Sequence, residues 1–279
     1  MSTPTQPINV PSLNPNPISH HSSAYSVLSH LHALSLSQER GKGNRGKHFP
    51  RLPGFEHLPG DARLGSTEEF VEELVALDED KALAVYMILR GMGARRVVEA
   101  GTSYGVSLIY LLCAVLDNIT GETPDAYGSG SNLPPLVVGT ELEPAKVAKA
   151  LAHVKEAFPL STHDPERYCQ VPQILNLLQG DLLQTIPSFF ESTSLPDQSI
   201  DALLLDIWAP LARPMLELIL PKLRRGAVVF LDNSMSSRDR YKDILEFLKG
   251  TEDSEGRRLF KCVTLPFEGG LEMCIYEGQ

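Results

Sequence analysis

Short apolar runs alternate with amphipathic stretches between residues 95 and 249 of this 279-residue chain. The runs are rich in β-branched residues, and we expect strands at 95–100, 136–141, 173–179, 200–206 and 227–231. Helices are expected after most of them, at 103–116, 144–158, 211–223 and 237–249. Strands that are apolar on both faces are typical of a parallel sheet covered by helices on both sides. The pattern therefore predicts an α/β, Rossmann-like, doubly wound fold.

The C-terminal segment has a different pattern. Two strand-like runs in "RRLFKCVTLPFEGGLEMCIYEG" are joined by "PFEGG", with no helix between them. A connection this short joins antiparallel strands, because parallel strands need a crossover. We therefore expect a mostly parallel, seven-stranded sheet that ends in an antiparallel C-terminal hairpin strand.

The N-terminal segment is rich in Pro, Ser, Asn and His. We expect residues 1–65 to be a low-complexity, largely flexible arm in which 24–36 form a short helix, and 66–279 to be the folded domain. Helical periodicity over 66–93 opens with a capping box, Ser66 to Glu69. Four histidines lie in the arm without nearby Cys, Asp or Glu, which favours solvated polar residues over metal ligands; they are His20, His21, His30 and His32.

Charge and composition exclude several partners. A formal net charge of −10 and a pI near 5.3 would repel a phosphate backbone, so we expect no nucleic acid partner. No apolar run reaches the ~18 residues of a membrane span, and the N-terminus does not resemble a signal peptide. Four cysteines without CxxC spacing suit reduced thiols. Together these features predict a cytoplasmic protein without a membrane partner.

The first expected strand ends in "VVEAGTSYGVS", an acid followed by two glycines. At the carboxyl edge of such a sheet, Gly101 would let the backbone approach a ligand, and Gly105 would let the helix pack tightly on the strand. The free N–H groups of the helix start suit a carboxylate. Glu99 would favour a cationic or donor-rich ligand. The spacing GxxxG differs from the GxGxxG dinucleotide fingerprint, so NAD fits poorly.

The pattern ExGxxxGxS, formed by Glu99, Gly101, Gly105 and Ser107, resembles the S-adenosylmethionine motif of the catechol O-methyltransferase and caffeoyl-coenzyme A O-methyltransferase family, a class I methyltransferase family. The resemblance implies S-adenosylmethionine as cofactor. The residues it assigns to the cofactor are Glu99, Gly101, Ser103, Gly105, Ser107, Glu141, Asp181 and Trp208. Glu141 would accept the ribose hydroxyls and Asp181 the adenine amino group. Each has a simpler alternative, since Glu141 can be a solvated acid and Asp181 a helix cap.

The runs "LLLDIW" and "VVFLDNS" place Asp206, Asp232 and Asn233 after two neighbouring strands. These oxygen ligands suit a hard divalent cation such as Mg²⁺, and they match the family's three metal ligands in type, order and spacing. Asp206 would then also be a catalytic residue. A metal-free site stays open, because an Asp at a strand end often caps a helix. Ala209 stands where relatives carry a lysine as general base.

The resemblance implies a divalent-metal-assisted O-methyltransferase that acts on a hydroxyl of a small phenolic or catechol-like molecule. Two alternatives stay open: a metal-independent O- or N-methyltransferase of the same fold, and a cofactor-binding protein without catalysis. The expected partner is a small-molecule acceptor, and the sequence leaves a homodimer open.

Overall fold

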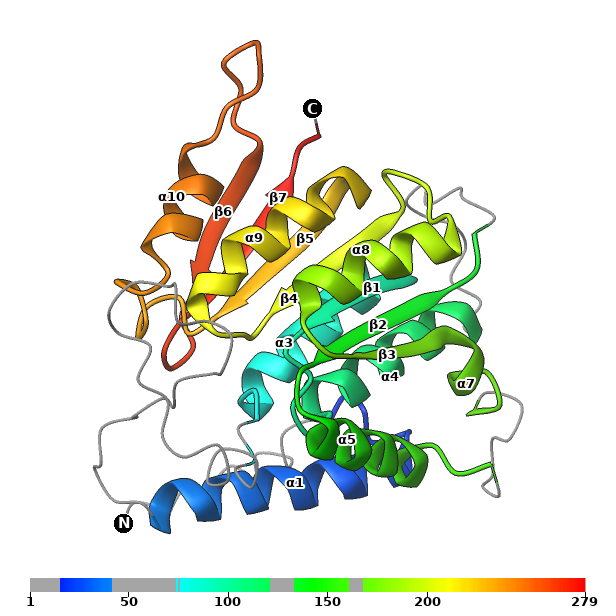
Figure 1. The fold of residues 1–279 in the computed structure, drawn as a ribbon. Coiled ribbons are helices and arrows are strands. Elements are labelled where there is room, and N and C mark those ends of the chain that lie inside the picture. The colour runs from blue at the N-terminus through cyan, green and yellow to red at the C-terminus, as the bar shows by residue number, and fades with distance from the viewer. Residues whose placement is uncertain (1–15, 42–73, 75, 121–132, 161–167, 279) are drawn as a thin grey trace, which may run out of the picture.

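The computed structural model describes residues 16–41, 74, 76–120, 133–160 and 168–278 (Figure 1). Its strands are β1 (Arg96–Ala100), β2 (Leu136–Glu141), β3 (Leu175–Gln179), β4 (Ile200–Leu205), β5 (Leu223–Asp232), β6 (Phe260–Leu265) and β7 (Leu271–Tyr276). Its helices are α1 (Ser22–Gly41), α3 (Glu79–Gly91), α4 (Val106–Thr120), α5 (Pro144–Ala157), α7 (Val171–Ile174), α8 (Leu182–Thr193), α9 (Ala209–Ile219), the 3₁₀ turn η1 (Leu220–Lys222) and α10 (Lys242–Gly250).

The strands form one seven-stranded sheet in the order β3-β2-β1-β4-β5-β7-β6. Strands β1 to β5 pair in parallel, and β7 lies antiparallel between β5 and β6. The predicted fold class is confirmed, including the antiparallel hairpin. Some boundaries differ: β5 begins at Leu223 and α10 only at Lys242, and helix α8 was not among the expected helices.

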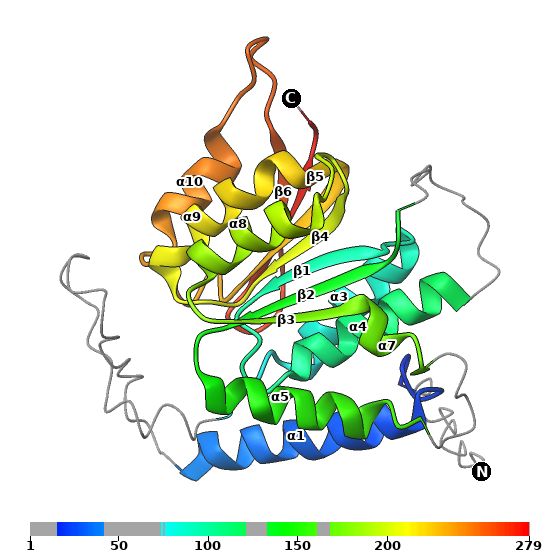
Figure 2. The same ribbon diagram turned by 45° about the vertical axis from the view of Figure 1, so that its right-hand side comes forward.

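The sheet is the middle layer of the molecule. Figure 2 shows α8, α9 and α10 on one face and α3, α4 and α5 on the other. Neighbouring residues of a strand point to opposite faces. Accordingly, Val97 of β1 belongs to the core beneath α3 and α4, whereas Val98 belongs to the core beneath α8 and α9. This double burial explains why the strands read as continuous apolar runs in the sequence.

Helix α1 packs on the outside of α5 and also contacts α4 (Figure 1). Val27, Leu28 and Leu31 of this helix are each at most 6% exposed and belong to the same core as α3 and α4. The prediction of a largely flexible arm is therefore wrong for residues 16–41. The apolar positions 24, 27, 28 and 31 follow helical spacing, and α4 and α5 supply the surface that covers them.

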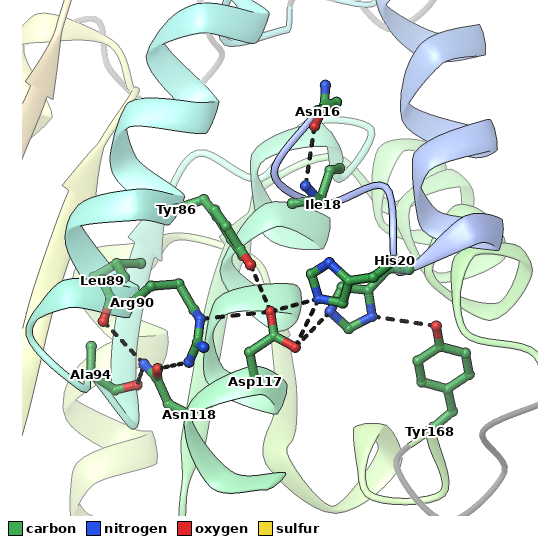
Figure 3. A network of polar contacts seen from close by, with 11 residues as sticks. Asn16, Ile18, His20, Tyr86, Leu89, Arg90, Ala94, Asp117, Asn118 and Tyr168 are labelled. Carbon is green, nitrogen blue, oxygen red and sulfur yellow. Dashed lines mark hydrogen bonds and ion pairs between the residues drawn. The ribbon is translucent and has the colours of Figure 1, made fainter. Parts of the chain in front are cut away.

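Two arm histidines anchor this segment to the end of α4 (Figure 3). The Nε2 atoms of His20 and His21 lie 3.1 and 3.0 Å from the Asp117 carboxylate, which also accepts a 2.6 Å hydrogen bond from the Tyr86 hydroxyl. Although burial alone would raise the pKa of Asp117, the hydrogen bonds from His21 and Tyr86 hold it well below its usual range. The expectation of solvated histidines is wrong for the fully buried His21.

His32 is also buried, and its Nε2 atom lies 3.1 Å from the Tyr110 hydroxyl oxygen. Burial lowers the pKa of His32, so the helix holds a neutral imidazole at this position. His30 is exposed, in line with the sequence expectation. The capping box at Ser66 to Glu69 lies outside the described residues.

The expectation that all four cysteines are reduced is also wrong. Cys262 and Cys274 face each other across β6 and β7, with Cα atoms 4.0 Å apart, and are joined by a disulfide. The hairpin register brings the two thiols together, which their separation in sequence did not indicate. Since disulfides are uncommon in reducing compartments, the cysteines no longer support a cytoplasmic location. Among the described helices, none is long and apolar enough to cross a membrane.

Candidate functional site

The strand order reverses between β1 and β4, so the helices that follow these strands lie on opposite faces of the sheet. Such a switch point leaves a crevice beyond the carboxyl ends of the strands, where doubly wound folds bind their ligands. Glu99, Gly101, Glu141, Asp206 and Asp232 all lie in or directly after the ends of β1, β2, β4 and β5. The topology therefore gathers the predicted site residues at one edge.

Gly101 has a φ of 93°, and a Cβ atom there would lie 2.1 Å from the Asp206 carbonyl oxygen and 2.7 Å from Cγ2 of Ile207. The sequence analysis assigned the space beside Gly101 to a ligand, but the backbone that follows β4 occupies the position of the missing Cβ atom. Gly105 has a φ of 87°, and its Cβ would lie 3.2 Å from the Ala150 Cβ. Gly105 therefore allows α4 to pack on helix α5, not on the strand as expected.

Glu99 is fully buried beneath the turn. Its Oε2 atom accepts a 2.7 Å hydrogen bond from the Thr102 hydroxyl, whereas Oε1 has no well-aligned partner among the described residues. Burial raises the pKa of Glu99 to about 7, although the hydroxyls of Ser107 and Thr102 oppose the shift. A cationic ligand beside this carboxyl would satisfy both its charge and its unpaired oxygen.

Ser103 and Glu141 join the first two strand ends. Ser103 has a φ of 48°, and its backbone N–H donates to Glu141 Oε2 at 2.8 Å. The backbone N–H of Glu143 donates to Oε1 at 3.0 Å. A carboxylate oxygen can accept more than one hydrogen bond, so Glu141 keeps capacity for ribose hydroxyls. The Ser103 Oγ is buried without a hydrogen-bond partner among the described residues.

Asp181 begins α8 as its N-cap, because its side chain accepts a 3.0 Å hydrogen bond from the Leu183 N–H. The helix-cap alternative is thus what the structure shows, and the adenine contact stays a prediction. The Gly180 N–H donates to the Glu141 carbonyl at 2.9 Å, which keeps this loop beside the end of β2. Trp208 is half-buried at the N-cap of α9, two residues after Asp206.

Asp206 and Asp232 form an acidic pair at the ends of β4 and β5. Burial raises the pKa of Asp206 well above its usual range, and the charges of Asp232 and Glu99 raise it further. Burial also raises the pKa of Asp232. Its Oδ2 atom accepts a 2.6 Å hydrogen bond from the Asn233 side-chain amide. The three predicted metal ligands therefore lie at the same end of the two strands.

Lys81 of α3 is a site residue that the sequence analysis missed. Its side chain is 1% exposed, and its Nζ lies 2.8 Å from Asp232 Oδ1 and 2.9 Å from Asp78 Oδ2. Although burial lowers the pKa of Lys81, the hydrogen bonds that its ammonium donates to these two carboxylates raise it above its ordinary value and keep the side chain charged. The signal in the sequence is that Lys81 shares helical spacing with the buried residues Val85 and Leu89.

This arrangement does not fit a divalent cation at the three predicted ligands. Asp232 already uses one oxygen for the Lys81 ammonium and the other for Asn233. Two unit charges 4 Å apart interact by about 4 kcal/mol at an effective dielectric constant near 20, so a dication beside the ammonium would meet about twice that repulsion. A metal ion would bind there only after Lys81 had moved away.

A hollow of about 730 Å³ lies at the opposite edge of the sheet. It is lined by residues that include Leu223 and Phe260, where β5 and β6 begin, and Tyr276, where β7 ends. Ligands of doubly wound folds bind beyond the carboxyl ends of the parallel strands, so this hollow is in the wrong place for the cofactor.

Residues 98–234 match a family model described as a methyltransferase domain. The chain carries a class I, S-adenosylmethionine-dependent methyltransferase domain. The matched segment runs from β1 to just beyond the end of β5, and it contains every predicted cofactor and metal residue. A search among curated protein sequences gave no match.

Solved structures share the fold. The O-methyltransferase TomG from Streptomyces achromogenes, involved in tomaymycin synthesis and solved with SAM, is 20% identical; the match covers 76% of this chain and 86% of TomG, with a TM-score of 0.56. An O-methyltransferase from Bacillus cereus, solved with SAH, is 13% identical over 90% of each chain, also with a TM-score of 0.56. At these identities the likeness shows the fold and leaves the acceptor open.

Proposed function

We propose that this protein is an S-adenosylmethionine-dependent O-methyltransferase that acts on a hydroxyl of a small phenolic or catechol-like molecule. The observation that carries the proposal is the pair of unsatisfied buried oxygens, Glu99 Oε1 and Ser103 Oγ, on the two sides of the Gly101 turn. Buried polar atoms normally have hydrogen-bond partners, and a donor-rich ligand at this turn would supply them. Both similar structures cited above are O-methyltransferases, one with SAM and one with SAH.

The residues present fit the cofactor. Glu99 and Ser103 would hold its amino acid part, and Glu141 at the end of β2 would accept hydrogens from its ribose. When bound, S-adenosylmethionine supplies an electrophilic methyl group. The chain would align the acceptor oxygen with that group, and such positioning accounts for much of the acceleration in two-substrate reactions. We assign Asp206 the role of accepting the hydroxyl proton of the acceptor.

The metal-assisted form of this mechanism, implied by the family resemblance, is the weaker form of the proposal, because Lys81 occupies Asp232. The metal-independent alternative agrees better with the ion pair. The sequence predicts no nucleic acid partner, no membrane partner and a cytoplasmic location, and these expectations stay predictions. Whether the chain forms a homodimer also stays open.

Calorimetric titration with S-adenosylhomocysteine tests the cofactor site. Glu141→Ala should weaken binding by about 1–3 kcal/mol, the usual cost of leaving buried hydrogen-bonding groups unpaired. Glu143→Ala removes the same charge from the same loop without touching the ribose position, and it should bind almost normally. Equal affinities of both variants and the unmodified protein would place the cofactor elsewhere.

Turnover is tested separately with S-adenosylmethionine and a panel of phenols, catechols and amines, by detecting S-adenosylhomocysteine. Methylated phenols support the proposal. Methylated amines alone would indicate an N-methyltransferase, and tight cofactor binding without any turnover would indicate a binding protein. Asp206→Asn should lower turnover while leaving S-adenosylhomocysteine affinity nearly unchanged.

A further inference from the structure

A buried cation already lies at the acidic end of the candidate site. The Lys81 ammonium sits between Asp232 and Asp78, at 2.8 and 2.9 Å, and its side chain is only 1% exposed. Removing an ammonium from water is costly unless partners compensate for its charge, and here two carboxylates do so. Since one of the two is Asp232, the lysine is part of the site and not of the surface.

The surroundings of Lys81 are closed by the β6–β7 turn. A Cβ atom at Gly269 would lie 2.7 Å from Asn233 Oδ1 and 3.6 Å from Lys81 Nζ, so the backbone of the turn packs against both side chains. The Gly269 carbonyl accepts hydrogen bonds from the Met235 and Ser236 N–H groups, at 2.9 and 3.0 Å, which hold the turn in place. The turn thus covers the Lys81 ammonium on the side of Asn233, whose Oδ1 atom also accepts a 3.2 Å hydrogen bond from the Ser236 hydroxyl.

The charges at this end of the sheet explain why a cation is needed. Burial raises the pKa of Asp206, and the negative charges of Asp232, Glu99 and Asp78 raise it further. Burial and the charge of Asp78 also raise the pKa of Asp232, whereas its contact with Lys81 lowers it. Carboxylates this close are compensated by a metal ion or by a positive side chain. The family resemblance implies that Mg²⁺ compensates the charge of these carboxylates. It also implies a lysine at the position where this chain has Ala209. Lys81 approaches the same carboxylates from α3 instead.

We infer that the Lys81 ammonium takes the place of a divalent cation at the Asp206, Asp232 and Asn233 cluster, so that the chain neutralises this cluster with its own side chain. The inference deepens the proposed function and rests on it only for its catalytic consequence, which is methyl transfer without an added metal ion. Its structural part concerns which cation the cluster holds, and that part is tested by metal binding alone.

Binding of Mn²⁺, followed by electron paramagnetic resonance and calorimetry, is the direct test. The unmodified protein should not bind Mn²⁺ at millimolar concentration. Lys81→Met should bind it at least tenfold more tightly than the unmodified protein, because three oxygen side chains lose their competing cation. Adding Asp232→Asn to Lys81→Met should abolish that gain. Lys146→Met is the matched control, since Lys146 is also buried, at 3% exposure, but lies on α5 away from the cluster.

Two outcomes overturn the inference. One is Mn²⁺ binding by the unmodified protein that Asp232→Asn removes, which would show that the metal displaces Lys81. The other is the absence of any gain in Lys81→Met, which would show that the cluster is no cation site. If Lys81→Met does not fold, Lys81→Gln replaces it, because its amide can still pair with Asp232 without carrying a charge.

Failure of the proposed function would be recognised separately. Methyl transfer that persists in excess EDTA supports the catalytic consequence, which is transfer without a metal ion. If EDTA abolishes methyl transfer and added Mn²⁺ restores it, the catalytic consequence is overturned. If no acceptor is methylated but Lys81→Met gains Mn²⁺ binding, the inference on Lys81 stands and the proposed function falls. Titration with S-adenosylhomocysteine checks that each variant keeps its cofactor site.

Discussion

At the scale of single residues, several predicted cofactor residues also hold the protein itself together. The Glu141 carboxylate accepts hydrogen bonds from the backbone N–H groups of Ser103 and Glu143, and Asp181 is the N-cap of α8. These contacts fix the loops before any ligand arrives, which is how an edge made of strand ends becomes a preorganised site. Substitutions here consequently act on local structure as well as on binding.

Gly101 illustrates this double role. Gly101→Ala should lower the free energy of unfolding by about 1–3 kcal/mol, typical for an overpacked site, because its Cβ would lie 2.1 Å from the Asp206 carbonyl oxygen. Denaturant unfolding measures the change. Gly91→Ala is the control, since a Cβ at Gly91 would meet nothing within 4 Å. An unfolding midpoint of Gly101→Ala equal to that of the unmodified protein would contradict the tight approach of β1 and β4.

At the scale of elements, α1 forms an outer layer on α5 and α4 (Figure 2). Its buried residues belong to the core that also contains α3 and α4, and His21 at its start binds Asp117 at the end of α4. The helix is therefore part of the folded domain, and removing it would expose apolar side chains of α4 and α5 to water.

Leu28→Ala should lower the free energy of unfolding by about 2–5 kcal/mol, the usual cost of a cavity at a buried leucine, since Leu28 is 1% exposed. Leu36→Ala, on the same helix at 51% exposure, should change it by less than about 0.5 kcal/mol. Thermal unfolding of both variants is the measurement. Equal melting temperatures would restore the interpretation of α1 as a separate arm.

At the scale of the whole molecule, buried acids at the carboxyl edge make stability depend on pH. Glu99 has a pKa of about 7 in the folded chain and 4.5 as its reference value, so between these values the folded state binds more protons than the unfolded state. The free energy of unfolding then falls as pH rises from about 4.5 to 7. For Glu99 this loss amounts to about 3 kcal/mol.

Glu99→Gln should remove that part of the pH dependence. The measurement is the free energy of unfolding in urea at pH 5 and at pH 8. Its decrease between these two pH values should be smaller in Glu99→Gln than in the unmodified protein, by about 3 kcal/mol. Because the charge of Glu99 also raises the pKa of Asp206, the difference between the two proteins includes this coupling as well as the titration of Glu99 itself. Parallel pH profiles of the two proteins would show that Glu99 titrates near its ordinary pKa.

Local sequence was sufficient for the sheet and for the acids at its edge. Burial on both faces of a parallel strand leaves a continuous apolar run, and the first polar residue after it marks where the strand ends. The positions of Glu99, Glu141, Asp206 and Asp232 follow from that rule, and parallel pairing then brings them to one edge.

Only the tertiary structure decided what each of these residues contacts. The ion pair of Lys81 with Asp232 joins α3 to β5, and the contact of Gly101 with Asp206 joins β1 to β4. The docking of α1 depends on the surface that α4 and α5 form together. Such contacts link segments far apart in the sequence, and no local period encodes them. The sequence therefore determined the edge where the site lies, and long-range packing decided that a lysine, and not an open set of oxygen ligands, faces Asp232.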